Sequence, residues 1–256
     1  MGSIDLLQQA LNAVKNGGKA AIATVVRTDR SVPRRVGASM LILDDGTRRG
    51  TVGGGEMEAR VVAEAVAAMS DGRPRLVNYR LVDPATGDPG VCGGEMDVYV
   101  EPYMDTPTLL VIGAGHVGKA VSELAHWTGW EVHLWDDRSE QTSELPEGVY
   151  GHGGNLSSAL SHIPLDSRSA IVMVTRNVAI DVELVPIVVQ QQAAYIGLMG
   201  SARRWATTRD SLLQAGCTEG DIERISTPIG LEIGAETPEE IAISIMAEVV
   251  RATTTR

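Results

Sequence analysis

The sequence predicts an α/β protein in which a small N-terminal α/β domain precedes a domain built on a parallel sheet. Two observations support this fold class. An apolar run at 109–112 leads into a glycine-rich turn and then into an apolar pattern of helical spacing. From there to the C-terminus, strand patterns alternate with helix patterns, which favours parallel strands joined by right-handed crossovers. We place the boundary within 104–107, so that the domains are 1–104 and 105–256.

Composition and charge narrow the classes of function. The chain has 256 residues, 43% of them hydrophobic, which is typical of soluble globular proteins. No apolar run approaches the roughly 18 residues that span a bilayer, and the first residues lack the features of a secretion signal. We therefore expect a cytoplasmic protein without membrane contact. A formal net charge of −11 argues against nucleic acid or an anionic membrane as the main partner.

Cysteine and histidine spacing argues against disulfides and metal. Cys92 and Cys217 lie far apart in the chain, so a disulfide framework is not expected. The five histidines show neither H-x-H nor H-E-x-x-H spacing, and none is near a cysteine in the sequence. No zinc site is predicted.

The N-terminal domain is expected to combine helices and short strands. Apolar residues at helical spacing predict helices at 4–14 and 57–71, which end at Gly17 and Gly72. Apolar and β-branched runs predict strands at 20–26, 39–43, 47–52, 75–81 and 96–100, with a turn at 44–46 between the second and third.

Two motifs of this domain could bind an anion. Four arginines fall within nine residues of an otherwise acidic chain: Arg27, Arg30, Arg34 and Arg35. Gly53, Gly54 and Gly55 lead into a helix, a pattern typical of nests in which backbone N–H groups converge on an anion. Glu58 has two interpretations: it stabilises the helix dipole, or it accepts hydrogen bonds from a polar heterocycle held over the glycines.

Cys92 is a candidate reactive thiol. It is followed by Gly93 and Gly94, which leave backbone room around the sulfur. Such a thiol could act as a ligand or nucleophile if its pKa is lowered. The alternative is a small buried residue at a tight turn.

The C-terminal domain opens with a dinucleotide-binding fingerprint. Gly113, Gly115 and Gly118 give G-x-G-x-x-G between a buried strand and a helix, and Asp136 follows about 20 residues later, at the end of a second strand. The glycines would in turn allow the tight turn, leave room for a pyrophosphate to approach, and let helix and strand pack closely. This is the arrangement of a Rossmann-like unit. A carboxylate at Asp136 would favour NAD over NADP. The loop could equally hold another phosphate ligand, or none.

The remaining elements place further candidates beside this loop. We expect strands at 148–152, 169–175 and 194–199, a helix at 178–192 and a closing helix that begins at Pro238. Ligands of such sheets lie beyond the carboxyl ends of the strands. The residues expected there are Gly113, Asp136, Thr175, Arg176, Gly200 and Ser201, with His116 in the glycine loop itself. Arg203 and Arg204 could be no more than solvated helix residues.

Taken in order, these motifs resemble the XdhC/CoxI family, accessory proteins that serve xanthine dehydrogenase and related molybdenum hydroxylases. The resemblance spans almost the whole chain. It is carried by residues 28–34 with 37–40, 53–55 with Glu58, 92–94 with 101–102, 113–118, 136–138, 175–176, 197–203, 228–234 and 238–244. Some relatives have a cysteine where Glu56 stands, and an acid and a histidine where Asn177 and Val178 stand, so no role is transferred to those positions.

The resemblance implies an XdhC domain joined to a Rossmann-like domain. It further implies that the protein binds the molybdenum cofactor, protects it while its terminal oxo ligand is replaced by sulfur, and delivers it to an apo-hydroxylase. A cysteine desulfurase would supply the sulfur. The sequence leaves the oligomeric state open, a homodimer included.

Our interpretation is a molybdenum-cofactor chaperone and not itself a redox enzyme. The cofactor is an anionic pterin with a phosphate, which the arginines and the glycine nest could hold, leaving Cys92 for the metal or a transferred sulfur. The alternative is an NAD(P)-dependent oxidoreductase acting on a small substrate between the domains. No proton-transfer dyad supports that alternative, since His116 lies within the glycine loop. A scaffold that binds only protein is a third hypothesis.

Overall fold

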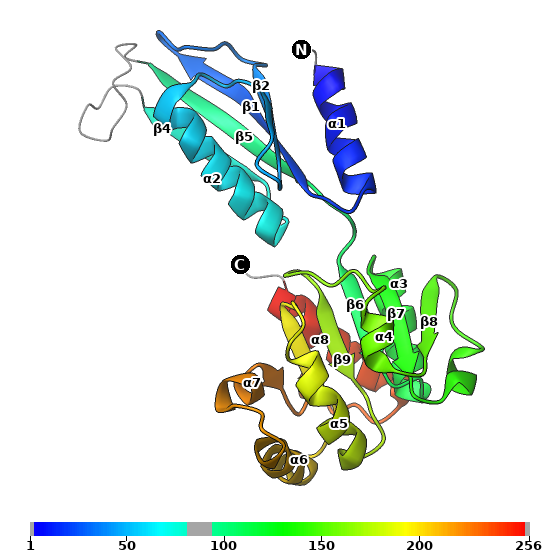
Figure 1. The fold of residues 1–256 in the computed structure, drawn as a ribbon. Helices are drawn as coiled ribbons and strands as arrows, with labels where there is room; N and C mark the ends of the chain where they lie inside the picture. The colour runs from blue at the N-terminus through cyan, green and yellow to red at the C-terminus, as the bar shows by residue number, and fades with distance from the viewer. Residues whose placement is uncertain (1–2, 81–93, 254–256) are drawn as a thin grey trace. The chain divides into compact units, whose positions relative to one another are not determined.

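The computed structural model describes residues 3–80 and 94–253 (Figure 1). The chain forms two compact units, Met1–Asp105 and Thr106–Arg256. Among the described helices, none combines the length and the apolar character that crossing a membrane requires.

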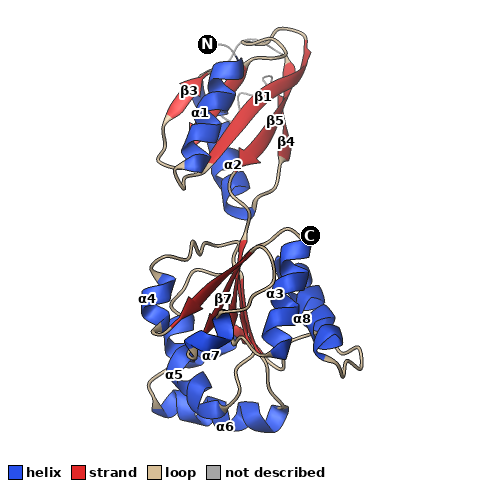
Figure 2. Ribbon diagram, turned by 90° about the vertical axis from the view of Figure 1, so that its right-hand side faces the viewer, coloured by secondary structure: helices blue, strands red, loops and turns tan. Residues whose placement is uncertain are grey.

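The first unit is an antiparallel sheet covered by a helix on each face. Its elements are α1 (Ser3–Lys15), β1 (Ala20–Asp29), β2 (Ser39–Leu43), β3 (Arg48–Gly50), α2 (Gly55–Asp71), β4 (Arg75–Arg80) and β5 (Glu95–Tyr103). The strands are arranged in the order β3-β2-β1-β5-β4, with every pair antiparallel. Figures 1 and 2 show α1 and α2 on opposite sides of this sheet.

Side-chain alternation along the strands explains the two covered faces. Along β1, Ala20 and Ile22 pack with the buried residues of α1, whereas Ala21 and Ala23 pack with those of α2. Successive residues of a strand point to opposite faces, so a continuous apolar run fits a sheet buried on both sides. Gly72 ends α2 in the left-handed conformation and donates its N–H to the carbonyl oxygen of Ala68.

The second unit is a six-stranded parallel sheet with helices on both faces. Its strands are β6 (Thr108–Ile112), β7 (Glu131–Asp136), β8 (Val149–Gly153), β9 (Ala170–Met173), β10 (Tyr195–Leu198) and β11 (Ile225–Ser226). They are arranged in the order β11-β10-β9-β6-β7-β8. The strand order reverses between β6 and β9, so the position where such folds bind ligands lies at the carboxyl ends of these two strands.

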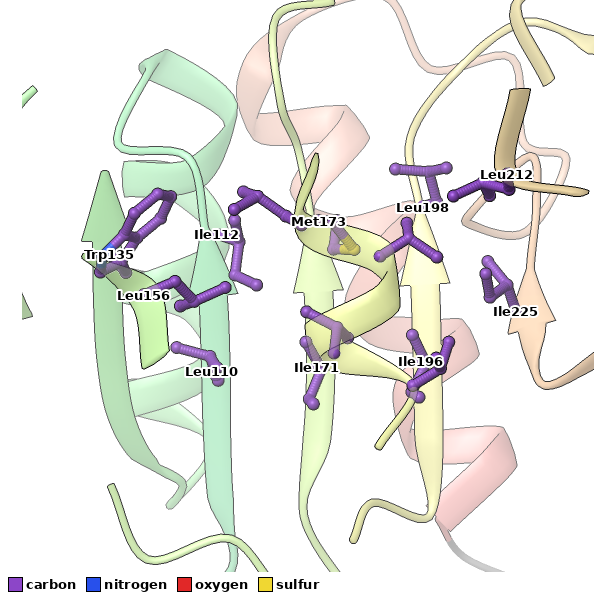
Figure 3. Packing of buried hydrophobic residues seen from close by; sticks show 14 of the residues in the cluster. Leu110, Ile112, Trp135, Leu156, Ile171, Met173, Ile196, Leu198, Leu212 and Ile225 are labelled. Carbon is purple, nitrogen blue, oxygen red and sulfur yellow. The ribbon is translucent and has the colours of Figure 1, made fainter. Parts of the chain in front are cut away.

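The helices of this unit divide between the two faces. They are α3 (His116–Trp127), α4 (Leu156–Leu160), α5 (Val178–Val188), α6 (Ala202–Gln214), α7 (Glu219–Glu223) and α8 (Pro238–Thr253). One core joins the sheet to α4, α5, α6 and α7; in Figure 3, Leu156 of α4 lies beside Leu110 and Ile112, and Leu212 of α6 lies beside Leu198. A second core joins the other face to α3 and α8, which lie side by side in Figure 2.

The α/β fold class and the parallel sheet of the C-terminal domain are confirmed. The expected strands all occur, with bounds that differ by a few residues. Four short elements were not expected: α4, α7, β11 and the 3₁₀ turn Ser139–Thr142. They span two to five residues each, too few for a periodic pattern. The helix expected at 178–192 ends at Val188.

Candidate functional site

Three separate sequence motifs meet at one end of the first unit. A side chain at Gly53 would place its Cβ 2.9 Å from Cγ of Pro33, in the arginine-rich loop. A side chain at Gly94 would overlap the carbonyl oxygen of Ser31 and lie 2.7 Å from that of Asp29. The arginine loop therefore lies against both the glycine turn and the start of β5. Cys92 lies outside the described residues.

The arginines of this loop differ in their availability. Arg27 donates to the carboxylate of Asp97 at 2.6 Å. Arg30 adopts a positive φ of 58° and its Nε is 3.8 Å from Asp29. Arg34 and Arg35 are exposed, and no hydrogen bond or ion pair joins either side chain to another part of the described chain. Two cations are thus free to meet an anion beside Pro33.

The glycine turn beside the loop is occupied by a carboxylate of the chain itself. Oε1 of Glu58 accepts from the N–H of Val52 at 3.2 Å and of Gly54 at 3.1 Å, and it also accepts from the hydroxyl of Thr51. The N–H of Gly53 is bonded to the Thr51 hydroxyl oxygen. The N–H groups of Gly53 and Gly54, two of the three expected from the sequence to face a ligand, are therefore already paired. Partial burial acts to raise the pKa of Glu58, but the hydrogen bonds from Thr51 and the backbone outweigh it and lower the pKa below its ordinary value.

In the second unit, the fingerprint glycines have distinct structural roles. Gly113 adopts a φ of +114°, and a Cβ there would lie 2.7 Å from the carbonyl oxygen of Val174. A Cβ at Gly118 would overlap the carbonyl oxygen of Gly113, so only glycine allows α3 to pack this closely. Gly115 is different: a Cβ there meets no atom within 4 Å. Its side faces open space, where a ligand could approach.

Asp136 is buried and bonded to the glycine loop. Its Oδ2 accepts from the N–H of Ala114 at 2.8 Å, and its Oδ1 accepts from the backbone N–H and the Nε of Arg138 at 3.0 and 2.9 Å. Only 2% of the residue is exposed. A ribose hydroxyl would have to compete with these partners for either oxygen.

Arg176 forms a bidentate ion pair beside the same glycine loop. Its two terminal nitrogens donate to the two carboxylate oxygens of Asp137, each at 2.7 Å. The hydrogen bond and charge of Arg176 lower the pKa of Asp137 to about 2. Both side chains are more than 40% exposed, so an incoming ligand could exchange with either.

A buried network behind the loop was not expected. Asp181 is fully buried; its carboxylate accepts from the guanidinium of Arg204, with Nη2 2.7 Å from Oδ2, and from the hydroxyl of Thr175. Arg204 also donates to the carbonyl oxygen of Thr175 at 3.1 Å. The interpretation of Arg204 as a solvated residue is wrong, because its side chain is only 20% exposed and ties α6 to the end of β9. Arg203 is exposed, as expected.

The structure brings some predicted residues together and leaves others apart. Gly113, Gly115, Asp136, Thr175 and Arg176 line one cavity of about 70 Å³ at the carboxyl ends of β6 and β9. The other candidates do not line it. His116 is the exposed first residue of α3, Gly118 lies inside that helix, and Ser201 caps α6 by accepting from the N–H of Arg204 at 3.2 Å, with Gly200 before it. Within 3–80 and 94–253, no group of histidine, cysteine and acidic side chains could hold a metal ion.

The fold and the two candidate sites define the class of the protein. It is an α/β protein of two units, the second of which carries a glycine-rich loop between a strand and a helix. Residues 109–249 match the XdhC Rossmann domain, and residues 13–80 match the XdhC and CoxI family. The first match covers more than half of the sequence, and the chain belongs to the XdhC family.

Individual relatives agree with this assignment. The chain is 33% identical over 235 residues to the uncharacterized protein YqeB of Escherichia coli, covering 90% of the chain and 43% of YqeB. It is 22% identical over 275 residues to the molybdenum cofactor insertion chaperone PaoD of the same organism, covering 95% of the chain and 86% of PaoD. The chain therefore spans less than half the length of YqeB but most of PaoD.

A solved structure shares the fold. A crystal structure of a xanthine dehydrogenase from Bacillus halodurans aligns with a TM-score of 0.52 at 21% identity, covering 100% of this chain and 97% of that one.

Proposed function

We propose that this protein binds the molybdenum cofactor and inserts it into a molybdenum hydroxylase of the xanthine dehydrogenase type. The observation that carries the proposal is the meeting of the arginine loop, the glycine turn and the start of β5 at one end of the first unit. Membership of the XdhC family and the likeness to PaoD along 95% of the chain support the same function.

The cargo would be held chiefly by arginine. A guanidinium presents two parallel N–H donors to a phosphate and remains charged at any physiological pH. Arg34 and Arg35 have no competing partner among the described residues, and Arg30 has only a distant one. Of the three glycines, Gly53 would contribute by letting the loop approach closely, since the N–H groups of Val52 and Gly54 are already bonded to Glu58.

The finer steps of the proposal concern sulfur. Cys92 would offer its thiolate to the metal or to a sulfur in transit, and a cysteine desulfurase would be the donor. The nearest described residue of that segment, Gly94, adjoins Ser31 and Asp29 of the arginine loop. The thiol and the cations would therefore serve the same cargo.

A second candidate function is that of an NAD(P)-dependent oxidoreductase. It is favoured by Gly115, whose open side would let a pyrophosphate approach the N-terminus of α3. It is disfavoured by Asp136, whose carboxylate already accepts from Ala114 and Arg138. A cavity of about 70 Å³ is also small beside the roughly 300–1,000 Å³ of ordinary ligand sites, so Arg138 or Arg176 would have to move.

Copurification tests the proposal. The protein is made in cells that synthesise molybdenum cofactor, and bound pterin is measured together with activation of a co-expressed apo-hydroxylase. The chaperone function predicts bound pterin and an increase in hydroxylase activity. Protein that carries no pterin and leaves the hydroxylase unaffected would disprove it; calorimetry with NAD and NADP would then test the second candidate.

A further inference from the structure

An apolar groove runs along the outer side of α3 and α8 in the second unit. The two helices lie side by side (Figure 2), and with the segment at 146–147 they border an open space of about 860 Å³. Its apolar lining consists of Ala120, Leu124, Trp127, Pro146, Ala242 and Ile243. None of these residues belongs to either candidate site described above.

The groove is open rather than enclosed. Trp127 is 82% exposed and Ile243 is 53% exposed, although both are large apolar side chains. A small molecule is usually buried over most of its surface, which this groove does not allow. Two packed helices instead form a trough into which a third amphipathic helix can place apolar residues, and an exposed tryptophan is a common anchor of such interfaces.

The charges around the groove indicate the chemistry of the occupant. Glu123, Glu147 and Glu239 also line it, together with a single histidine, His126, and all four are exposed. No arginine, lysine or histidine within the described residues forms an ion pair with any of the three glutamates. Glu239 lies in the first turn of α8, where the helix dipole stabilises it, but Glu123 and Glu147 have no such role. Three unpaired carboxylates around an apolar floor complement arginine or lysine beside an apolar stripe.

A second copy of this chain fits the groove poorly. A two-fold contact would bring the same surface of both copies together. The acidic residues of one copy would then face those of the other, and like charges across an interface oppose association.

We propose that the groove between α3 and α8 is a docking site for a basic amphipathic helix of a partner protein. Trp127 and Ile243 anchor its apolar stripe, and the three glutamates receive its basic flanks. This interaction is separate from the two candidate ligand sites and does not depend on the function proposed above.

Synthetic peptides test the docking site on the intact protein. One peptide carries a helical leucine stripe flanked by arginines, and the second has glutamate in place of each arginine. Binding is measured by calorimetry and by the shift in emission as Trp127 loses contact with water. The proposal expects the basic peptide to bind, more weakly at high salt, and the acidic peptide not to bind.

Matched variants distinguish the groove from the rest of the surface. Trp127→Ala should weaken binding of the basic peptide by about 30-fold or more, the effect typical of a hot-spot aromatic residue. Ile243→Ala should weaken it several-fold, whereas Ile233→Ala should not, although Ile233 is 54% exposed. Glu123→Lys should weaken binding and slow association, whereas Glu183→Lys, on exposed helix surface of α5, should leave both unchanged.

Three results would overturn the proposal. These are failure of the basic peptide to bind, a loss of affinity in the control variants as large as in the groove variants, and equal binding of the two peptides. Sedimentation of the protein alone gives a fourth result: self-association that Trp127→Ala abolishes would assign the groove to a second copy of the chain.

Discussion

A single side chain, that of Glu58, stabilises the turn between β3 and α2. Its Oε1 is the acceptor for the N–H groups of Val52 and Gly54 and for the hydroxyl of Thr51. Glu58→Ala would leave donors unpaired beside the fully buried Val52, which costs about 1–3 kcal/mol. Urea unfolding measures this change. Glu56→Ala is the control, because Glu56 is exposed two residues earlier in the same helix; equal losses in the two variants would contradict the role of Glu58.

The lowered pKa of Glu58 gives this stabilisation a pH dependence. Because hydrogen bonds favour the ionised form in the folded protein, the contribution is fully present above the ordinary glutamate pKa of 4.5. It is lost as the pH falls through the lower folded pKa. The stability difference between wild type and Glu58→Gln should therefore shrink as unfolding is measured from pH 6 down to about pH 3. A difference that grows toward acid would reverse the sign of the shift.

Arg34 is one of the two loop arginines without a partner among the described residues, and its loss should weaken retention of the pterin. A charge-assisted hydrogen bond contributes about 1.5–3 kcal/mol, so Arg34→Ala should weaken retention of the cofactor by roughly 10- to 150-fold. Arg34→Lys should recover only part of it, because lysine keeps the charge but lacks the planar fork. Arg203→Ala, which removes an exposed arginine of the other unit, is the control. Pterin measured in the purified proteins decides the outcome, and unchanged retention in Arg34→Ala would remove this residue from the site.

At the scale of elements, different glycines of the glycine loop serve folding and ligand binding. Gly118→Ala should destabilise the second unit severely, because the new Cβ overlaps the carbonyl oxygen of Gly113. Gly115→Ala should leave the melting temperature unchanged, since its Cβ enters open space. It should nevertheless weaken the binding of any ligand that approaches the loop closely. Thermal unfolding and calorimetry with NAD measure the two effects. A destabilised Gly115→Ala protein would show that its open side is needed for packing.

The buried network of Thr175, Asp181 and Arg204, which joins the end of β9 to α5 and α6, should contribute to stability. Removing one partner of a buried ion pair costs about 3–5 kcal/mol, and Arg204→Ala should fall near the lower figure because its side chain is 20% exposed. Arg203→Ala, one residue earlier on the same helix, should change the free energy of unfolding by less than about 0.5 kcal/mol. A double-mutant cycle with Asp181→Asn should be strongly non-additive, and additive losses would contradict direct pairing.

Local patterns predicted the fold, but not which polar groups are already paired. The apolar run at 109–112 and the glycines after it have a spacing that only a few structures satisfy, so strand, turn and helix could be predicted. The pairing of Asp181 with Arg204 joins residues 23 positions apart, and nothing in either neighbourhood specifies the other. Glu58 is close in sequence to its partners, but whether a carboxylate turns back onto a glycine turn or faces a ligand depends on side-chain geometry. Sequence could therefore name candidate residues without determining which remain free.

For the whole molecule, the two candidate sites belong to different units, and their functions should be separable. Arg34→Ala is expected to abolish activation of the co-expressed hydroxylase while leaving any heat of nucleotide binding unchanged. Gly115→Val is expected to abolish any heat of nucleotide binding while leaving activation of the hydroxylase unchanged. Its new side chain enters the space beside the glycine loop of the second unit. Both variants are first checked for wild-type circular dichroism and melting temperature. If Gly115→Val removed pterin from the protein while it remained folded, the cargo would depend on the Rossmann unit, and the assignment of the cargo site to the arginine loop would fail.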